Sequence, residues 1–384
     1  LFLWGGMARA QNAPRPRLGL WMECDGKFRT LDDPERIRAA VSSARALGAT
    51  DLFVQVFRNG KAWFATELAD DAPYRRAKAR GFAPLAEMIA RAHARHIRVH
   101  AWVNLLRVDD GAETALVRAL GRDSVLTDAT GRSLLDPGPW GKKRNTRPDT
   151  PGAWLDPASP VVVARLTALL AALIEAYPSL DGIHLDYVRY PFPIGSGGRS
   201  ADLGWSKGSR SRFLADLGPQ SGRGTRSQWD DWRREKLTVL LRSIRESAKR
   251  KKPSLEVSAA VLADPREAID RSLQDWPEWT REGLLDLAVP MNYHADALRF
   301  DSLARACVRH RGKADVLMGV GAWRFGGRVG AIAARVDLAL AAGAQGAVLF
   351  SHDNLKSHPG ALPRLGALLR AEVLPEKPDA TPSD

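Results

Sequence analysis

One short segment combines residues that could do chemistry with the pattern of a buried strand. Residues 181–191 read DGIHLDYVRYP. With a period of two, Ile183 and Leu185 share one face of a strand, and His184 and Asp186 share the other. Burying a histidine and an aspartate costs desolvation free energy, and such a cost is typical of a catalytic site. We predict that this is the active-site strand; the alternative is that Asp186 only caps the loop that follows.

Polar side chains stand opposite aliphatic ones in other segments as well. Residues 18–23 place aliphatic side chains on one face and Trp21 and Glu23 on the other. The same alternation predicts a polar ring towards the carboxyl ends of the strands, made of Glu23, Gln55, His100, Asn104, His184, Asp186 and Asn292. Packing alone rarely needs so many inward polar groups. Tryptophan and tyrosine side chains beside them suit the apolar faces of sugar rings.

A repeating unit of strand, loop and amphipathic helix must position these residues. The predicted strands are residues 18–23, 51–58, 98–104, 182–187, 255–261, 285–293, 316–322 and 346–351. The predicted helices are residues 34–47, 82–95, 160–177, 229–251, 276–282, 300–311 and 330–342. Eight alternating units predict a single (β/α)8 TIM barrel, an α/β fold with its active site at the carboxyl ends of the strands.

Segments outside these units complete the predicted organisation. Long loops, residues 105–159 and 191–228, follow the third and fourth strands and should flank the active site, where Trp140 or Trp205 would stack on a sugar ring. We expect the barrel to occupy residues 13–372, with a disordered Pro- and Asp-rich tail at 373–384. Residues 1–12 contain Ala8-Arg9-Ala10, an A-x-A pattern, and are interpreted as a signal-peptide remnant and leader. The protein would therefore be exported to the periplasm or outside the cell.

Composition narrows the possible partners. The 384 residues carry a net charge of +13, but no nucleic-acid-binding motif accompanies it. We therefore expect no nucleic-acid partner and a possible association with the anionic cell envelope. The two cysteines are expected to be free thiols, and no His or Cys cluster predicts a metal site. No run of about 18 apolar residues predicts a membrane span.

Several motifs together resemble one family. They are residues 19–23 (GLWME), 52–56 (LFVQV), 99–104 (VHAWVN), 155–157 (LDP), 181–191, 229–233 (WDDWR) and 289–293 (VPMNY). In this order they resemble the glycosyl-hydrolase-like family 10, bacterial TIM-barrel proteins connected with hydrolysis of peptidoglycan or other glycans. Where such proteins often carry Arg-Gly-Asp after the second strand, this chain has Asn59-Gly60-Lys61. A substrate contact from that aspartate is therefore not expected here.

The segment around Asp186 is also similar to the DGxDxDxE motif of family-18 chitinases. The terminal catalytic glutamate of that motif falls on Val188, which cannot donate a proton. Chitinase-type catalysis with that acid is therefore excluded. The chitinase Met-x-Tyr motif is matched by residues 291–293, which would suit an N-acetylated sugar.

Glycoside hydrolysis usually needs two carboxyl groups, an acid and a base or nucleophile. Asp186 is the first predicted catalytic residue and Glu23 the second, with Asp353 as the alternative to Glu23; which one is the acid stays open. Glu23 and Asp186 would face each other across the barrel mouth, which favours the wider spacing of inverting enzymes. The predicted substrate-binding residues are Trp21, Gln55, Arg58, His100, Trp102, Asn104, His184, Tyr187, Arg189, Tyr190, Asn292, Tyr293, His294, Trp323 and Asp353.

These observations predict a glycoside hydrolase that acts as a monomer, without cofactor or metal, on peptidoglycan or a related envelope polysaccharide. Two alternatives stay open. One is a non-catalytic carbohydrate-binding barrel, which the lack of a second acid near Asp186 would favour. The other is a different sugar chemistry, a lyase or a deacetylase, and a metal ion in the cleft would favour the deacetylase.

Overall fold

Eight parallel strands close into a barrel, so the predicted fold is confirmed. The computed structural model describes residues 15–108, 114–136, 152–192, 203–219 and 224–371. The predicted leader, the predicted tail and Trp140 lie outside the described residues. The barrel strands are β1 (Arg17–Met22), β2 (Asp51–Arg58), β4 (Arg98–Asn104), β5 (Gly182–Asp186), β6 (Glu256–Leu262), β7 (Leu287–Asn292), β8 (Asp315–Gly321) and β9 (Gly346–Phe350). They pair in this order around the ring, which the pairing of β9 with β1 closes.

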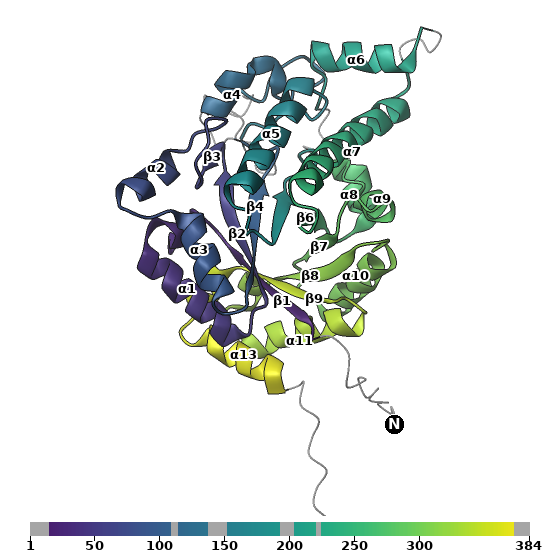
Figure 1. The fold of residues 1–384 in the computed structure, drawn as a ribbon. Coiled ribbons are helices and arrows are strands. Elements are labelled where there is room, and N and C mark those ends of the chain that lie inside the picture. The colour runs from purple at the N-terminus through teal and green to yellow at the C-terminus, as the bar shows by residue number, and fades with distance from the viewer. Residues whose placement is uncertain (1–14, 109–113, 137–151, 193–202, 220–223, 372–384) are drawn as a thin grey trace, which may run out of the picture.

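Helices surround the barrel (Figure 1). They are α1 (Pro34–Leu47), α2 (Ala72–Ala79), α3 (Pro84–His93), α4 (Ala115–Leu120), α5 (Pro160–Ala176), α6 (Lys207–Leu217), α7 (Arg226–Lys251), α8 (Pro265–Ser272), α9 (Trp276–Glu282), α10 (Ala297–Arg309), α11 (Val329–Ala341), α12 (His352–Lys356) and α13 (Ala361–Ala371). The predicted helices are all present, with ends that differ by a few residues at most. The segments expected to be long loops contain α4 and α6. None of the described helices is long and apolar enough to cross a membrane.

Local sequence signals fix where the helices begin. The side chain of Asp33 accepts hydrogen bonds from the backbone of residues 35 and 36, and Pro34 occupies the first turn of α1. Thr225 and Gln228 form a reciprocal capping box at the start of α7. These caps hold the helices in place on the outside of the barrel.

The strands separate two apolar layers. The larger layer lies between the barrel and the helices and contains Leu20, Val54 and Val99. The smaller layer fills the barrel interior and consists of Trp21, Phe53, Trp102, Leu287, Val289, Leu317 and Val348. Alternation along each strand therefore decides which side chains can reach the interior and its open end.

A β-bulge interrupts this alternation in β2. Gln55 pairs with Trp102 of β4, but Phe57, not Val56, pairs with the next residue, Val103. Val56 and Phe57 both pack in the outer layer, so the following residue, Arg58, faces the interior like Gln55. A short antiparallel strand, β3 (Lys61–Ala62), pairs with the end of β2 beyond the bulge.

A network of charged residues lies at the amino-terminal end of the barrel. Asp51, the fully buried first residue of β2, lies 2.8 Å from the Arg17 guanidinium and 3.0 Å from that of Arg98. The Arg17 guanidinium also lies 2.9 Å from Glu256 at the start of β6. His100 Nε2 lies 2.9 Å from Asp51 Oδ1, so the prediction that His100 binds substrate at the other end is wrong. Burial alone would raise the pKa of Asp51, but hydrogen bonds and charges from His100 and Arg17 hold that pKa far below its usual value.

Both ends of the described chain lie on this amino-terminal side (Figure 1). The chain enters β1 at Arg17. At the other end, Arg370 of α13 donates a hydrogen bond to the carbonyl of Ala46, near the end of α1 that leads into β2. The barrel mouth, formed by the carboxyl ends of the strands, is on the opposite side.

Candidate active site

A pocket of about 220 Å³ opens at the barrel mouth. It is lined by Trp21, Glu23, Gln55, Arg58, Trp102, Asn104, Arg107, Asp186, Tyr187, Arg189, Ala260, Met291, Tyr293 and Phe350. These residues come from the ends of most barrel strands and from the segments that follow them. The pocket therefore occupies the place where TIM-barrel enzymes carry their active sites.

Asp186 is the last residue of β5 and lies level with Asn104 of β4. The backbone N–H of Tyr187 donates to its Oδ1 over 2.7 Å, and Trp102 Nε1 donates to its Oδ2 over 3.2 Å. The pKa of Asp186 is raised above its usual value, because burial raises it by more than these hydrogen bonds and the charges of Arg189 and Arg107 lower it. Both carboxyl oxygens thus accept N–H groups, an arrangement that stabilises the ionised form.

Glu23 follows β1 and enters the same pocket. Ser351 Oγ donates to Glu23 Oε2 over 3.1 Å, and Arg58 Nη1 lies 3.8 Å from Oε1. Burial raises the pKa of Glu23 and the negative charge of Asp353 raises it further, against the hydrogen bond from Ser351 and the charge of Arg58. A hydroxyl group can also accept a hydrogen bond, so Ser351 can remain a partner when Glu23 is protonated.

Two amide side chains lie in the pocket wall. Gln55 Nε2 donates to Asn104 Oδ1 over 3.1 Å. Gln55 Oε1 accepts from the backbone N–H and the Sγ of Cys24, over 3.4 and 3.3 Å. These contacts fix the orientation of both amides, which could then bind hydroxyl or acetamido groups of a sugar.

His184 lies one layer below the pocket and orients Trp21. The hydroxyl of Ser258 donates to the Ile183 carbonyl over 3.1 Å and can therefore accept from His184 Nδ1, 2.9 Å away. Nε2 then accepts from Trp21 Nε1 over 3.1 Å. Burial lowers the pKa of His184 well below its usual value, and the charge of His100 lowers it further, which agrees with this neutral tautomer. The prediction that His184 binds substrate is wrong: it is covered by Trp21 and fully buried.

Aromatic and guanidinium groups alternate along one wall. Tyr187 has a left-handed backbone conformation, with φ of 55°. The Arg189 guanidinium lies 5.2 Å from the centre of the Tyr187 ring and 5.1 Å from Trp154, while the Arg107 guanidinium lies 5.7 Å from the Tyr187 ring. Both distances to Tyr187 are in the range of cation–π contacts. The Tyr187 ring is therefore in contact with two cations at the edge of the pocket.

The prediction that Asn292 lines the mouth is also wrong. Leu287 and Val289 fill the barrel interior and Met291 packs against them, so the alternation of β7 places Asn292 on the outer face. There Asn292 Nδ2 donates to the carbonyl of Phe300 in α10. Its neighbour Tyr293 does line the pocket.

Four further residues predicted to bind substrate do not line the pocket. Tyr190 is buried against Arg233 of α7, 5.3 Å from its guanidinium. Asp353 accepts a hydrogen bond from the backbone N–H of Phe28 over 3.1 Å and lies beside His352. Burial would raise the pKa of Asp353, but these two contacts hold it below the usual value. His294 and Trp323 are exposed at the end of β7 and after β8.

The expected sugar-stacking role of Trp205 is not supported either. Trp205 stacks on Trp229 of α7, with ring centres 4.6 Å apart. Among the described residues of the two long segments, Arg107 lines the pocket and none of residues 191–228 does.

Sequence reasoning missed Arg107, Ala260, Met291 and Phe350. Met291 and Phe350 follow the interior alternation of β7 and β9 and could have been found from it. Arg107 comes after the end of β4, where no period of two applies. Its position depends on the segment that pairs residue 107 with Trp154.

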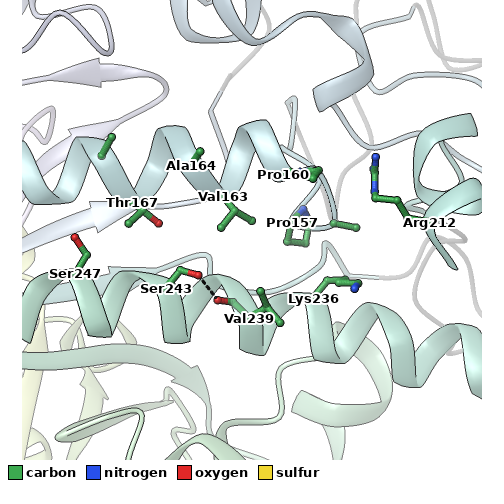
Figure 2. Close-up of a pocket in the computed structure, with 12 residues that line it drawn as sticks. Pro157, Pro160, Val163, Ala164, Thr167, Arg212, Lys236, Val239, Ser243 and Ser247 are labelled. Carbon is green, nitrogen blue, oxygen red and sulfur yellow. Dashed lines mark hydrogen bonds between the residues drawn. The ribbon is translucent and has the colours of Figure 1, made fainter. Parts of the chain in front are cut away.

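A larger groove, of about 530 Å³, lies elsewhere, between α5 and α7. Figure 2 shows Val163, Ala164 and Thr167 of α5 facing Val239 and Ser243 of α7, with Lys236 and Arg212 at one end. It contains no carboxyl group among its lining residues. The paired acids therefore make the smaller pocket at the mouth the candidate active site. In the described part of the chain, no three His, Cys, Asp or Glu side chains are grouped as metal ligands.

Comparisons with known proteins agree with the resemblance seen in the motifs. The model of the family described as glycosyl hydrolase-like 10 matches residues 17–313. The Escherichia coli K12 protein named glycosyl hydrolase DigH is 26% identical over 336 residues, which covers 78% of this chain and 71% of the relative. Glycosyl hydrolase YngK of Bacillus subtilis is 22% identical over 242 residues, 58% of this chain and 42% of the relative.

Solved structures share the fold at low identity. α-L-Fucosidase isoenzyme 2 from Paenibacillus thiaminolyticus matches 94% of this chain and 49% of its own, with a TM-score of 0.61 and 16% identity. The catalytic domain of β-amylase from Paenibacillus polymyxa matches 94% of this chain and 99% of its own, with a TM-score of 0.61 and 12% identity. At these identities the likeness concerns the barrel fold.

Proposed function

The chain belongs to the glycosyl hydrolase-like 10 family, and from this premise we propose that its barrel mouth hydrolyses a glycosidic bond in a cell-envelope polysaccharide such as peptidoglycan. The family and its curated relatives support a glycoside-hydrolase type of function. The polysaccharide and the roles of the residues are proposals that rest on the pocket and on the composition of the chain.

The observation that carries the proposal is the presence of Glu23 and Asp186 in one pocket. Glu23 follows β1 and Asp186 ends β5, and these strands are separated by three steps around the ring of eight strands. A glycosidic oxygen between them could receive a proton from one side while the other acid acts on the opposite side of the sugar. A carbohydrate-binding barrel without catalysis would not need this second acid.

The hydrogen bonds favour different roles for the two acids. Burial raises the pKa of Asp186 as well, but Asp186 accepts two N–H groups, which favours the carboxylate and suits a general base or nucleophile. Glu23 has a hydroxyl partner and a pKa raised by burial and by Asp353, which suits a general acid. We therefore assign the proton donor to Glu23 and the ionised role to Asp186.

The rest of the pocket would hold the sugar. Trp21 and Trp102 are buried and their indole N–H groups are bonded to His184 and Asp186, whereas the partly exposed rings of Tyr187, Tyr293 and Phe350 offer aromatic surfaces. A ring that stacks on them would be oriented by the Gln55–Asn104 amide pair. Tyr293, which follows β7, would face the acetamido group of an N-acetylated sugar.

The sequence supports the location in which this chemistry would take place. The A-x-A pattern near residue 8 supports export to the periplasm or outside the cell. A net charge of +13 supports association with anionic envelope polymers. We propose a monomer that needs no cofactor and has no nucleic-acid partner.

The proposal is tested with purified peptidoglycan, intact and stripped of its stem peptides. Wild-type protein should release soluble saccharides that mass spectrometry identifies, and protein carrying both Glu23→Gln and Asp186→Asn should release none. A folded wild-type protein that binds the glycan but releases nothing from either preparation would instead support the carbohydrate-binding alternative.

A further inference from the structure

An exposed aromatic side chain lies at the barrel mouth, outside the pocket. Trp323 belongs to the short 3₁₀ helix Ala322–Phe325, which directly follows β8. Trp323 is 44% exposed, whereas Ala322 and Phe325 on either side of it are buried. The core therefore holds this helix in place while the helix presents an indole ring to the solvent.

Contacts of the same segment restrict how far this ring can move. The guanidinium of Arg335 in α11 lies 5.4 Å from the centre of the Phe325 ring and donates a hydrogen bond to the carbonyl of Ala295. Arg335 thus connects the segments that follow β7 and β8. The Arg324 guanidinium lies 4.1 Å from the centre of the Trp323 ring, in the range of cation–π contacts. The exposed indole is therefore a preorganised surface.

Gly321 brings Trp323 next to the pocket. It is the last residue of β8 and shares the interior face of that strand with Leu317. A Cβ atom on Gly321 would lie 3.1 Å from Trp323 Nε1 and 3.1 Å from both Cβ and Cδ1 of Tyr293. The edge of the indole and the Tyr293 ring therefore lie side by side over the space that a side chain here would fill. Because Tyr293 lines the pocket, Trp323 continues the aromatic wall outwards.

The size of the pocket gives this position a meaning. Its volume of about 220 Å³ is below the roughly 300–1,000 Å³ of sites that enclose a drug-sized ligand. A polysaccharide that reaches the acids must therefore continue over the rim. Tyr293 is close to those acids: burial raises the pKa of Tyr293, and the charges of Asp186 and Glu23 raise it further. Trp323 lies one ring beyond Tyr293, where a neighbouring sugar unit of the same chain would pass.

We propose that Trp323 forms a second sugar subsite, on which one unit of a glycan chain stacks while a neighbouring unit occupies the pocket. The apolar face of a pyranose ring suits the indole surface, and the indole N–H can donate to a sugar oxygen. The protein then binds oligosaccharides in preference to single sugars. This inference rests on the proposed function, because it takes the substrate of the pocket to be a polysaccharide.

Binding of sugars of two lengths tests the inference. The probes are N-acetylglucosamine, which can occupy the pocket alone, and a tetrasaccharide prepared from peptidoglycan stripped of its stem peptides. The full-length chain carries Glu23→Gln in every binding experiment, so that the tetrasaccharide stays intact. Calorimetry measures the dissociation constant of the tetrasaccharide, and a nuclear magnetic resonance titration measures the weaker binding of the single sugar. The tetrasaccharide should bind about 10-fold or more tightly, as one additional stacked ring predicts.

Substitutions locate the subsite. Trp323→Ala should weaken binding of the tetrasaccharide by about 10-fold and leave binding of N-acetylglucosamine unchanged. Trp323→Phe keeps an aromatic ring and should retain most of the affinity for the tetrasaccharide. Leu368→Ala is the control for loss of an exposed apolar side chain, because Leu368 is 38% exposed on α13, on the side opposite the mouth (Figure 1). It should change neither affinity, and the melting temperature of each variant verifies its fold.

The outcomes separate the two proposals. Unchanged binding of the tetrasaccharide by Trp323→Ala would overturn the inference, and so would an equal loss for both sugars, which would indicate a change in the pocket itself. Failure of the tetrasaccharide to bind more tightly than the single sugar would overturn it as well. A preference for the tetrasaccharide that depends on Trp323, in a protein whose wild type releases no saccharide from peptidoglycan, would support the inference and overturn the hydrolase.

Discussion

Asp186 and Glu23 have the same chemical group in different surroundings. The Asp186 carboxyl has N–H donors on both oxygens, whereas Glu23 has a hydroxyl and a more distant guanidinium. Burial raises the pKa of both. The donors, and not the burial, therefore distinguish the base from the acid.

Asp186→Asn should lower turnover of glycan by at least about 100-fold, because it removes the charge and the titratable group while keeping the size of the side chain. Glycan binding and the melting temperature should change little. Asp231→Asn is the matched control, since Asp231 is exposed on α7, and it should keep wild-type turnover. A folded Asp186→Asn protein with full activity would refute the catalytic assignment.

At the residue scale, the sequence predicted those pocket residues that both face the barrel interior and lie near the carboxyl end of a strand. Trp21, Glu23 and Asp186 follow the period of two and lie near strand ends, and all three line the pocket. His100 and His184 also face inward, but they lie deeper in the barrel than the pocket. There they contact Asp51 and Trp21, and their polarity alone did not reveal these structural contacts. Asn292 was assigned to the wrong face because a polar side chain was expected inside, whereas in β7 the apolar Leu287, Val289 and Met291 occupy the interior face.

At the scale of elements, the β2 bulge has the clearest effect on the site. Without it, Gln55 and Arg58 would lie on opposite faces of the strand. With it, both line the pocket and Phe57 joins the outer layer. The bulge therefore brings the Arg58 guanidinium into the pocket, where it lies 3.8 Å from Glu23.

Arg58→Gln should move the alkaline limb of the pH–rate profile to higher pH. The Arg58 charge lowers the pKa of Glu23; without it Glu23 keeps its proton to higher pH, and a general acid remains active as long as it is protonated. Asp353→Asn should move the same limb to lower pH, because the Asp353 charge raises the pKa of Glu23. The measurement is kcat/KM against pH for the three proteins.

The result also tests the assignment of roles. If Glu23 were the base, Arg58→Gln would instead move the acidic limb of the profile to higher pH. Neither limb moving would show that Glu23 does not titrate in the reaction.

The bulge itself was not predictable, because residues 51–58 alternate regularly and only the pairing with β4 shows the extra residue.

At the scale of the whole molecule, ionic contacts hold the amino-terminal end of the barrel and the pocket occupies the other. Asp51 is fully buried among Arg17, Arg98 and His100. Because its pKa is far below the usual value in the folded state, its contribution to stability is complete above the unfolded value of about 3.9 and is lost as the pH falls below that.

Asp51→Asn should lower the free energy of unfolding by about 3 to 5 kcal/mol at pH 7, because it removes the fully buried counter-charge of Arg17 and Arg98. The difference from the wild type should shrink as the pH is lowered below about 4. Asp315→Asn, at an exposed strand start, should change stability little at either pH. Denaturant titrations at neutral and acidic pH measure this, and a constant difference between them would contradict the assignment.

The barrel could be predicted from sequence because each strand–helix unit repeats the same pattern of short apolar strand and amphipathic helix. The segments after β4 and β5 could not, because α4 and α6 lack a long periodic pattern and their places depend on tertiary contacts. One such contact is Asp156, whose buried carboxylate accepts a hydrogen bond from Ser209 of α6 over 2.6 Å. A composition rich in turn residues hid these helices.

The position of the two described chain ends has a practical consequence. Both lie on the side opposite the barrel mouth (Figure 1). A purification tag, or a linker that fixes the protein to a bead or sensor surface, can therefore be joined at either end with the pocket directed outwards. An immobilised protein in this orientation could meet an insoluble polymer face on, which solid-phase binding measurements with cell-wall fragments require.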